Sequence, residues 1–371
     1  MINSNYKNSY YISQNAVSKP NFKGSSKDTS SNQANNEGLS SGAKWGIGLG
    51  LVALASVGVY LATKKKPDSK QVSEAIKHFS PAKNIDEAKN YAKKELGVEY
   101  VDDNLANLDM MNTVNEWIHK EKIYRKNETP NAVLFSKEER IDSPLGLIDE
   151  IEFNGNKFNC LKINVNFVEK FDDFLNQAYE HRLKQFIKKN DKNKYELINP
   201  EHSNYNLNKL IEKMNAHNEK SSYKEKMEIF NGISEAITYF NKIGKGEKAT
   251  MSSFSHEDAF IHEIGHLLHS KKYKHYNDSA ERKAIFKEFI DNKTHIAEEV
   301  SEYAKNSPLE FVAETYKKIR KGETLSDDVK KLYKEYDGPG GFPDEIPNII
   351  YKEKPQNDKS WLIGAALLGS V

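Results

Sequence analysis

Histidines gather in one short segment of this sequence. Five of the 11 histidines lie between His256 and His275, and two of them belong to an HExxH motif, His262-Glu263-Ile264-Gly265-His266. On a helix, residues four apart lie on the same face, about 6 Å apart along the axis, so both imidazoles can reach a single ion. The spacing therefore predicts two metal ligands on one helix.

The chemistry that suits this spacing is metal-assisted hydrolysis. Two neutral imidazole nitrogens can hold Zn²⁺, and a carboxylate beside them can take the proton of a bound water. Glu263 follows the first histidine, so it can point at that water without being a ligand. We therefore predict His262 and His266 as zinc ligands and Glu263 as the general base. We expect the remaining histidines to be solvated or to lie behind the ligands: His256, His269 and His275.

A catalytic zinc also needs a third protein ligand and an open position for water. The next carboxylate-rich segment begins at Ser307, a residue that suits a helix N-cap, and Pro308 suits the first helical position. Glu310 then takes the third helical position, where it could also act as a capping-box glutamate. Glu314 lies one turn further along the same face, and either carboxylate could complete the site.

These motifs, taken together, resemble the lethal-factor-type zinc metalloproteases, a family that includes secreted Pro-Pro endopeptidases. That family pairs HExxH with a downstream tyrosine, followed seven residues later by the first glutamate of an E-F-x-A-E helix. Here Tyr303 and the segment Glu310-Phe311-Val312-Ala313-Glu314 match, in addition to His262, Glu263 and His266. The resemblance covers Lys248 to Lys321, about a fifth of the chain.

The resemblance implies a particular site and substrate. One Zn²⁺ would be held by His262, His266 and Glu310, with Glu314 behind them to orient a histidine ligand. Tyr303, in the loop that leads into the third-ligand helix, would donate its hydroxyl to the oxygen on which negative charge develops. The substrate would be a protein or peptide bound as an extended strand, often containing proline.

The elements expected around this site give an α+β, mostly helical, zincin-like domain with a small sheet. Ala132–Ser136 is a short strand candidate, and Ile148–Phe153 and Lys157–Phe167 flank Asn154-Gly155, a strong hairpin indication. Lys248–Phe254 is predicted as an edge strand to which a peptide could add. Ser255 is predicted to cap the HExxH helix. Helical periodicity predicts three further helices: Val168–Lys189, Leu207–His217 and Ser222–Lys242.

Outside the catalytic domain, expected over residues 131–337, the composition changes. Residues 1–43 are rich in Asn and Ser and are predicted to be a disordered tail. Trp45–Thr63 contains no charge and, as a helix, would span about 28 Å, enough to cross a bilayer. Residues 69–130 are predicted as a helical stalk or accessory region. Residues 338–371 are predicted as a Pro/Gly-rich linker and a short apolar tail.

Lysines around the apolar run predict its orientation. Lys27 and Lys44 precede it, whereas five lysines follow it within a similar length: Lys64, Lys65, Lys66, Lys70 and Lys77. The positive-inside rule then places the catalytic domain on the cytoplasmic side of a single-pass anchor, with the extracellular side as the alternative. The known relatives are secreted, so an anchor is a departure from the family.

Composition excludes other classes of protein. Lys and Arg total 55 against 54 Asp and Glu, and a net charge of +1 argues against a dedicated nucleic-acid binder. The single cysteine, Cys160, excludes an internal disulfide and an all-thiolate metal site, and we expect it to pack as a small hydrophobic residue.

The sequence thus predicts a membrane-anchored zinc endopeptidase, with two alternatives. The first is a regulatory protease with an HExxHxxxH helix that acts on a repressor-type partner, although Ser270 stands where its extra histidine would be. The second is an inactive zincin-like domain retained as a binding module. A complete set of ligands, base and tyrosine argues against the second alternative.

Overall fold

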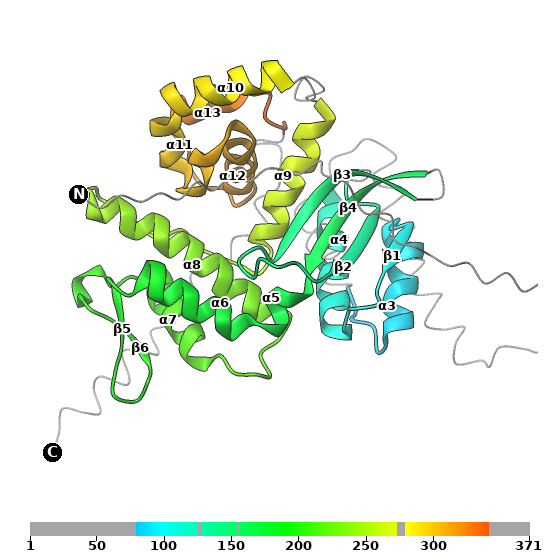
Figure 1. The fold of residues 1–371 in the computed structure, drawn as a ribbon, viewed down its shortest axis with the longest axis horizontal. Coiled ribbons are helices and arrows are strands. Elements are labelled where there is room, and N and C mark those ends of the chain that lie inside the picture. Colours follow the sequence, from blue (N-terminus) through cyan, green and yellow to red (C-terminus); the bar gives the residue numbers. More distant parts are fainter. Residues whose placement is uncertain (1–78, 125–127, 154–155, 273–278, 341–371) are drawn as a thin grey trace, which may run out of the picture. The chain divides into compact units, whose positions relative to one another are not determined.

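The computed structural model describes residues 79–124, 128–153, 156–272 and 279–340 (Figure 1). These residues form a mostly helical α+β structure with a small mixed sheet, as the sequence predicts. The expected tail at 1–43 and the apolar run at 45–63 lie outside the described residues, as do residues 341–371. Within the described ranges, no helix combines the length and apolar character needed to span a bilayer.

The main sheet has four strands in the order β1-β2-β4-β3. β1 pairs parallel with β2, β2 parallel with β4, and β3 antiparallel with β4. The predicted strand Ala132–Ser136 is confirmed as β2, and the predicted hairpin is confirmed as β3 and β4. The strands are β1 (Tyr100–Asp102), β2 (Ala132–Ser136), β3 (Leu145–Phe153) and β4 (Asn156–Asn164).

β4 ends earlier than the sequence suggests. The alternating pattern extends to Phe167, but the Asn164 side chain accepts a hydrogen bond from the Asn166 N–H and caps helix α5 (Val165–Glu169). An asparagine at this position favours a helix start over a longer strand. Cys160 on β4 is fully buried beside Ala132 and Phe158, and burial raises the pKa of its thiol to about 12, so its packing role is confirmed.

The region 69–130, expected to be a stalk or accessory region, contributes to the same core as the sheet. It supplies strand β1 and the buried side chains of Met110, Met111 and Trp117. Trp117 stacks on Phe260, which belongs to the HExxH helix, with ring centroids 5.6 Å apart. The helices of this region are α3 (Ile85–Tyr91), the π-helix η1 (Ala92–Leu96) and α4 (Leu108–Tyr124).

Of the three helices predicted before the histidine cluster, two are confirmed and the third is wrong at its C-terminal end. Leu207–His217 and Ser222–Lys242 correspond to α7 (Tyr205–Ala216) and α8 (Tyr223–Gly244), and Ser222 forms a capping box with Glu225. The prediction Val168–Lys189 fails at its C-terminal end, because Ile187–Lys189 pairs with Tyr195–Leu197 as β5 and β6. A short apolar run with lysines is compatible with both helical and strand periodicity, and pairing with a second strand determines the structure here. The part of the predicted helix up to Leu183 forms the end of α5, α6 (Phe171–Ala178) and the π-helix η2 (Tyr179–Leu183). The 3₁₀-helix η3 (Pro200–His202) precedes α7.

The predicted edge strand Lys248–Phe254 is wrong, because this segment has no strand partner among the described residues. Side chains from distant parts of the chain instead bond two backbone carbonyls of this segment and that of Ser255, which follows it. Asn206 donates to Met251 O at 2.8 Å, Asn231 donates to Ser255 O at 2.7 Å, and the Lys321 ammonium donates to Ser253 O. These three carbonyls are therefore satisfied without a ladder.

The remaining helices carry the predicted site. Ser307 caps α12, accepting from the Glu310 N–H at 3.1 Å, and Pro308 begins it, as predicted. The HExxH helix begins at Asp258, later than expected, and Ser255 lies in the preceding turn, where its hydroxyl bonds the Asp258 carboxylate at 2.8 Å. These elements are α9 (Asp258–Lys272), α10 (Ser279–Asn292), α11 (Thr294–Val300), the 3₁₀-helix η5 (Tyr303–Asn306), α12 (Pro308–Arg320) and α13 (Asp327–Glu335).

α9 packs closely on α12 because the HExxH motif contains a glycine. A Cβ on Gly265 would lie 3.0 Å from the Ala313 Cα and 3.2 Å from the Tyr316 Cβ. Such distances are shorter than van der Waals contact, and the nearest atom belongs to the backbone of α12, which cannot move aside without moving the helix. Gly265 therefore permits the approach that brings the histidines of α9 to the carboxylates of α12.

Gly265→Ala should lower the free energy of unfolding by about 1–3 kcal/mol, the cost of overpacking a tight contact. Gly244→Ala is the matched control, because it too is a helical glycine, and a Cβ there would meet nothing within 4 Å. Urea denaturation of both variants tests this. Equal stability of the two variants would mean that the packing of α9 on α12 does not require a glycine at position 265.

Candidate metal centre

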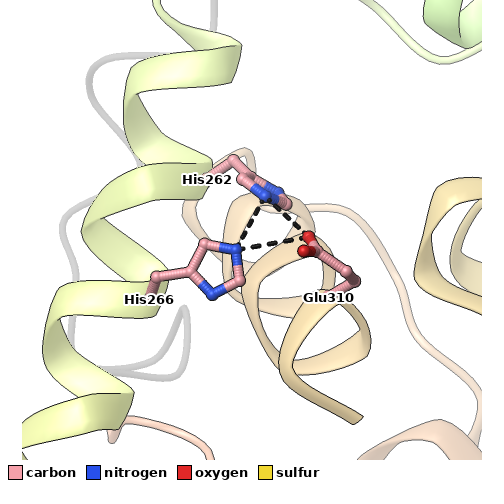
Figure 2. Close-up of side chains that lie close together, drawn as sticks. All are labelled: His262, His266 and Glu310. Carbon is pink, nitrogen blue, oxygen red and sulfur yellow. Dashed lines mark hydrogen bonds and ion pairs between the residues drawn. The ribbon is translucent and has the colours of Figure 1, made fainter. Parts of the chain in front are cut away.

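Three potential ligand atoms converge between α9 and α12 (Figure 2). The Nε2 atoms of His262 and His266 lie 3.1 Å apart. The Glu310 Oε2 lies 3.1 Å from the first of these nitrogens and 3.2 Å from the second. The i,i+4 spacing on α9 and the N-terminal position of Glu310 on α12 thus form a nearly equilateral triangle of two imidazoles and one carboxylate.

The triangle fits a zinc ion. Ligands held at about 2.0–2.1 Å in tetrahedral geometry lie about 3.3 Å apart, close to the separations seen here. The donor set is also appropriate, since two imidazoles and one carboxylate leave the fourth position of a tetrahedral zinc open for water. Of the two glutamates that the sequence leaves open, Glu310 is the one whose oxygen lies on the triangle.

Glu314 lies behind His262, as the resemblance implies. Its Oε1 accepts from the His262 Nδ1–H at 2.8 Å, which directs the Nε2 of the same ring toward the triangle. Its Oε2 accepts from the Lys317 ammonium at 3.0 Å. A carboxylate on the outer nitrogen of a ligand histidine fixes both the tautomer and the orientation of the ring.

Charge in the site favours a cation. Burial alone would lower the pKa of His262, but hydrogen bonds to Glu310 and Glu314 raise it to about 10. Burial would raise the pKa of Glu310, yet the two histidines lower it to about 2. The pKa of Glu314 lies well below its usual value, against the effect of burial, because of Lys317 and then His262. The two carboxylates that favour a positive charge on the His262 ring would also favour a divalent ion bound to that ring.

Glu263 lies beside the triangle and is not part of it. Its carboxylate accepts a hydrogen bond from the backbone N–H of Leu147, a residue of β3. Burial raises the pKa of Glu263, although the histidines His266 and His262 oppose that effect. A carboxyl group with a raised pKa, held in place by a backbone donor, suits a group that first takes and later gives a proton.

Tyr303 begins the 3₁₀-helix η5, directly before α12, where the sequence predicts a loop. Its ring centroid lies 5.6 Å from that of His262. Next to it, the Ser301 hydroxyl accepts from the Ala304 N–H at 3.1 Å, so the turn that carries the tyrosine is fixed by its own sequence. The structure therefore brings Tyr303 to the same site as the HExxH residues.

Two of the other histidines are held by hydrogen bonds away from the triangle. His269 is buried and its Nε2–H donates to Tyr336 O at 2.8 Å. His256 accepts from the Trp117 Nε1–H at 2.8 Å through Nδ1. His269 is therefore not solvated, whereas the His256 side chain keeps 17 % of its surface exposed and stacks on Trp117, with ring centroids 6.1 Å apart. His275 lies outside the described residues.

A second grouping of potential ligands, Glu116, His256 and Glu257, does not fit a metal. The Lys120 ammonium pairs with Glu257 and, at 2.9 Å, with Glu116. Lys224 also pairs with Glu116. Two ammonium groups already balance the two carboxylates. Burial, followed by the Lys120 charge, lowers the pKa of His256 to about 4.

Sequence reasoning missed the residues that support the ligands from a distance. The spacing of Glu314 and Lys317 on one helix, three residues apart, is a local indication of their ion pair. The contact of Leu147 with Glu263 has no local indication, because the two residues are far apart in the sequence.

Comparison with known proteins gives no match: no protein-family model, no curated protein and no solved structure matches this chain. The geometry of the site and the motifs in the sequence are therefore the basis for a function of this protein.

Proposed function

We propose that this protein is a zinc-dependent endopeptidase with a zincin-like catalytic domain. The observation that supports it most is the triangle of His262, His266 and Glu310, with Glu263 and Tyr303 beside it. A metal site alone could be structural. A site with three protein ligands, an adjacent buried carboxylate and a tyrosine instead resembles a hydrolytic centre.

A zinc ion held by His262, His266 and Glu310 would supply a Lewis acid for the substrate carbonyl and would lower the pKa of a bound water. Glu263 then takes the proton from the attacking water and passes it to the leaving amine nitrogen. The Leu147 N–H keeps the Glu263 carboxylate in place during both transfers.

The substrate is best accommodated at β3. β3 pairs only with β4 among the described strands, so its other edge has no strand partner. The Leu147 N–H on this strand donates to Glu263, which puts the general base beside the unpaired edge. An extended peptide that added to this edge would run beside Glu263. β3 thus replaces Lys248–Phe254 as the proposed substrate strand.

Cleavage of an unbiased peptide library by the full chain tests this function. We expect internal cleavage that stops on addition of a zinc chelator and returns when zinc is restored. A chain that binds zinc but cleaves nothing would support the inactive binding module instead.

The HExxHxxxH alternative has less support from the site. The Ser270 hydroxyl, at the position of the extra histidine, donates to Leu267 O at 3.1 Å on its own helix. The neighbouring His269 is bonded to Tyr336 O. Neither side chain is directed to the triangle.

Tyr303→Phe should lower kcat about 100-fold, the effect of losing one donor to a developing oxyanion. The variant keeps the ring beside His262 and removes only the hydroxyl, so zinc content and Tm should not change. Steady-state kinetics with zinc analysis test this. If stability falls while turnover per folded molecule is retained, Tyr303 only packs the turn.

The membrane anchor at 45–63 stays a prediction from the sequence. Membrane fractionation of the full chain, compared with a chain that lacks this segment, tests it. Recovery of both in the soluble fraction would rule the anchor out.

A further inference from the structure

A row of buried charges leads away from the metal centre through α12 to α8. It begins at Glu314, whose Oε1 bonds His262 and whose Oε2 accepts from Lys317. The Lys317 ammonium also lies 3.5 Å from Glu235 Oε1. Glu235 Oε2 lies 3.4 Å from Lys318. All four charged groups beyond the histidine are buried.

Stability alone is a weak explanation for such a row. Removing two charges from water costs about as much as their attraction returns, so apolar side chains of similar volume would often stabilise the fold equally well. The row is also specific in its direction, because its first carboxylate, Glu314, bonds the outer nitrogen of a predicted zinc ligand. The arrangement of the row therefore indicates a role in the metal centre and not only in the stability of the core.

Within the row, Lys317 determines how Glu314 is oriented. A carboxylate can rotate, and one donor leaves that rotation free. Here each oxygen has its own donor, His262 on Oε1 and Lys317 on Oε2. Lys317 is in turn held by Glu235 from α8, so its ammonium has a fixed position. Two donors from two helices fix the carboxylate plane and with it the imidazole ring.

We propose that Lys317, held by Glu235, is a positioning residue that sets the affinity of the site for zinc by orienting Glu314 and, through it, His262. This inference rests on the proposed function, because it assumes that the triangle binds zinc. It adds a residue with no direct contact to the ligand atoms and predicts a measurable effect on metal binding.

The neighbouring residue provides a matched control. Lys317 and Lys318 are 7 % and 5 % exposed, and each forms a buried ion pair with Glu235. Lys318 differs in its other partners, Ser252 at 2.8 Å and Glu323 at 3.0 Å, and the structure gives it no ion pair with Glu314. Replacing either lysine thus removes one buried charge from the same helix. Only Lys317 contacts Glu314, the first carboxylate of the row.

The experiment compares Lys317→Met with Lys318→Met in the full chain. Zinc Kd is measured by competition with a chromogenic chelator, and the visible bands of the Co²⁺-substituted protein report the geometry of the ligands. Lys317→Met should raise the Kd about 10–100-fold, the usual effect of losing an outer partner of a ligand, and should shift the Co²⁺ bands. Lys318→Met should lower Tm to a similar extent but leave both metal readouts unchanged.

Equal effects of the two substitutions on Kd would overturn the inference and leave Lys317 as a structural charge. A wild-type chain that binds no zinc would instead overturn the proposed function, and the inference with it. If Lys317→Met does not fold, Glu235→Gln replaces it, because it keeps Lys317 but removes the charge that holds it. Its zinc affinity should fall in the same direction, and an unchanged affinity would contradict the inference.

Discussion

Glu263→Gln should lower kcat at least about 100-fold while zinc content and Tm stay at the wild-type level. The amide has the shape of the carboxylate and can still accept the Leu147 N–H, so the local structure should persist. It cannot take a proton from water. The loss should therefore be confined to the chemical step, seen as a lower kcat with little change in KM.

Glu257→Gln is an informative control for that variant. Glu257 is a buried glutamate just before the same helix, and its partner is Lys120. Its substitution should lower Tm through the broken ion pair and leave turnover per folded molecule intact. The two glutamines should thus give opposite patterns. Full activity of Glu263→Gln would contradict the assignment of Glu263 as the general base.

The parts of the site that the sequence could predict are those with local causes. The i,i+4 histidines need only one helix, and Ser307 with Pro308 marks the start of another. The pairing of β3 with β4, predicted from the Asn154-Gly155 pair, likewise depends on a short-range turn preference. Such features are set by neighbours in the chain, so periodicity and capping rules find them.

The errors lie where distant residues decide the structure. Lys248–Phe254 has strand composition, but Asn206 and Lys321 bond two of its carbonyls, and both residues are far away in the sequence. The position of β3 at the edge of the sheet depends on strand order, which no local pattern encodes. The pairing of Lys317 with Glu235 is another long-range contact. Tertiary packing overrides local preference in each case.

Glu310→Ala should abolish zinc binding, whereas Glu314→Gln should only weaken it. Glu310 Oε2 is one vertex of the ligand triangle, so its removal leaves two imidazoles for the metal. Glu314 touches the outer nitrogen of His262 and not the triangle. Losing such an outer partner costs about 10–100-fold in affinity, and losing a ligand costs more.

Thermal and chemical unfolding with and without zinc distinguishes the two roles, because a ligand that binds only the folded state stabilises it. Zinc at 100 times the wild-type Kd should add about 2.7 kcal/mol to the free energy of unfolding. The same zinc concentration should add about 1.4 kcal/mol or less to Glu314→Gln, given a Kd raised about tenfold or more.

The same treatment should add nothing to Glu310→Ala, and metal analysis after dialysis should find no zinc in it. Phe311→Leu is the matched control on α12, since Phe311 is buried next to Glu310 in the chain but packs with Phe289 and Tyr336 away from the ligands. It should lower Tm and retain the zinc-dependent increase. If zinc remained in Glu310→Ala and was lost from Glu314→Ala, the third ligand would lie one turn further along α12, and the triangle would not be the metal site.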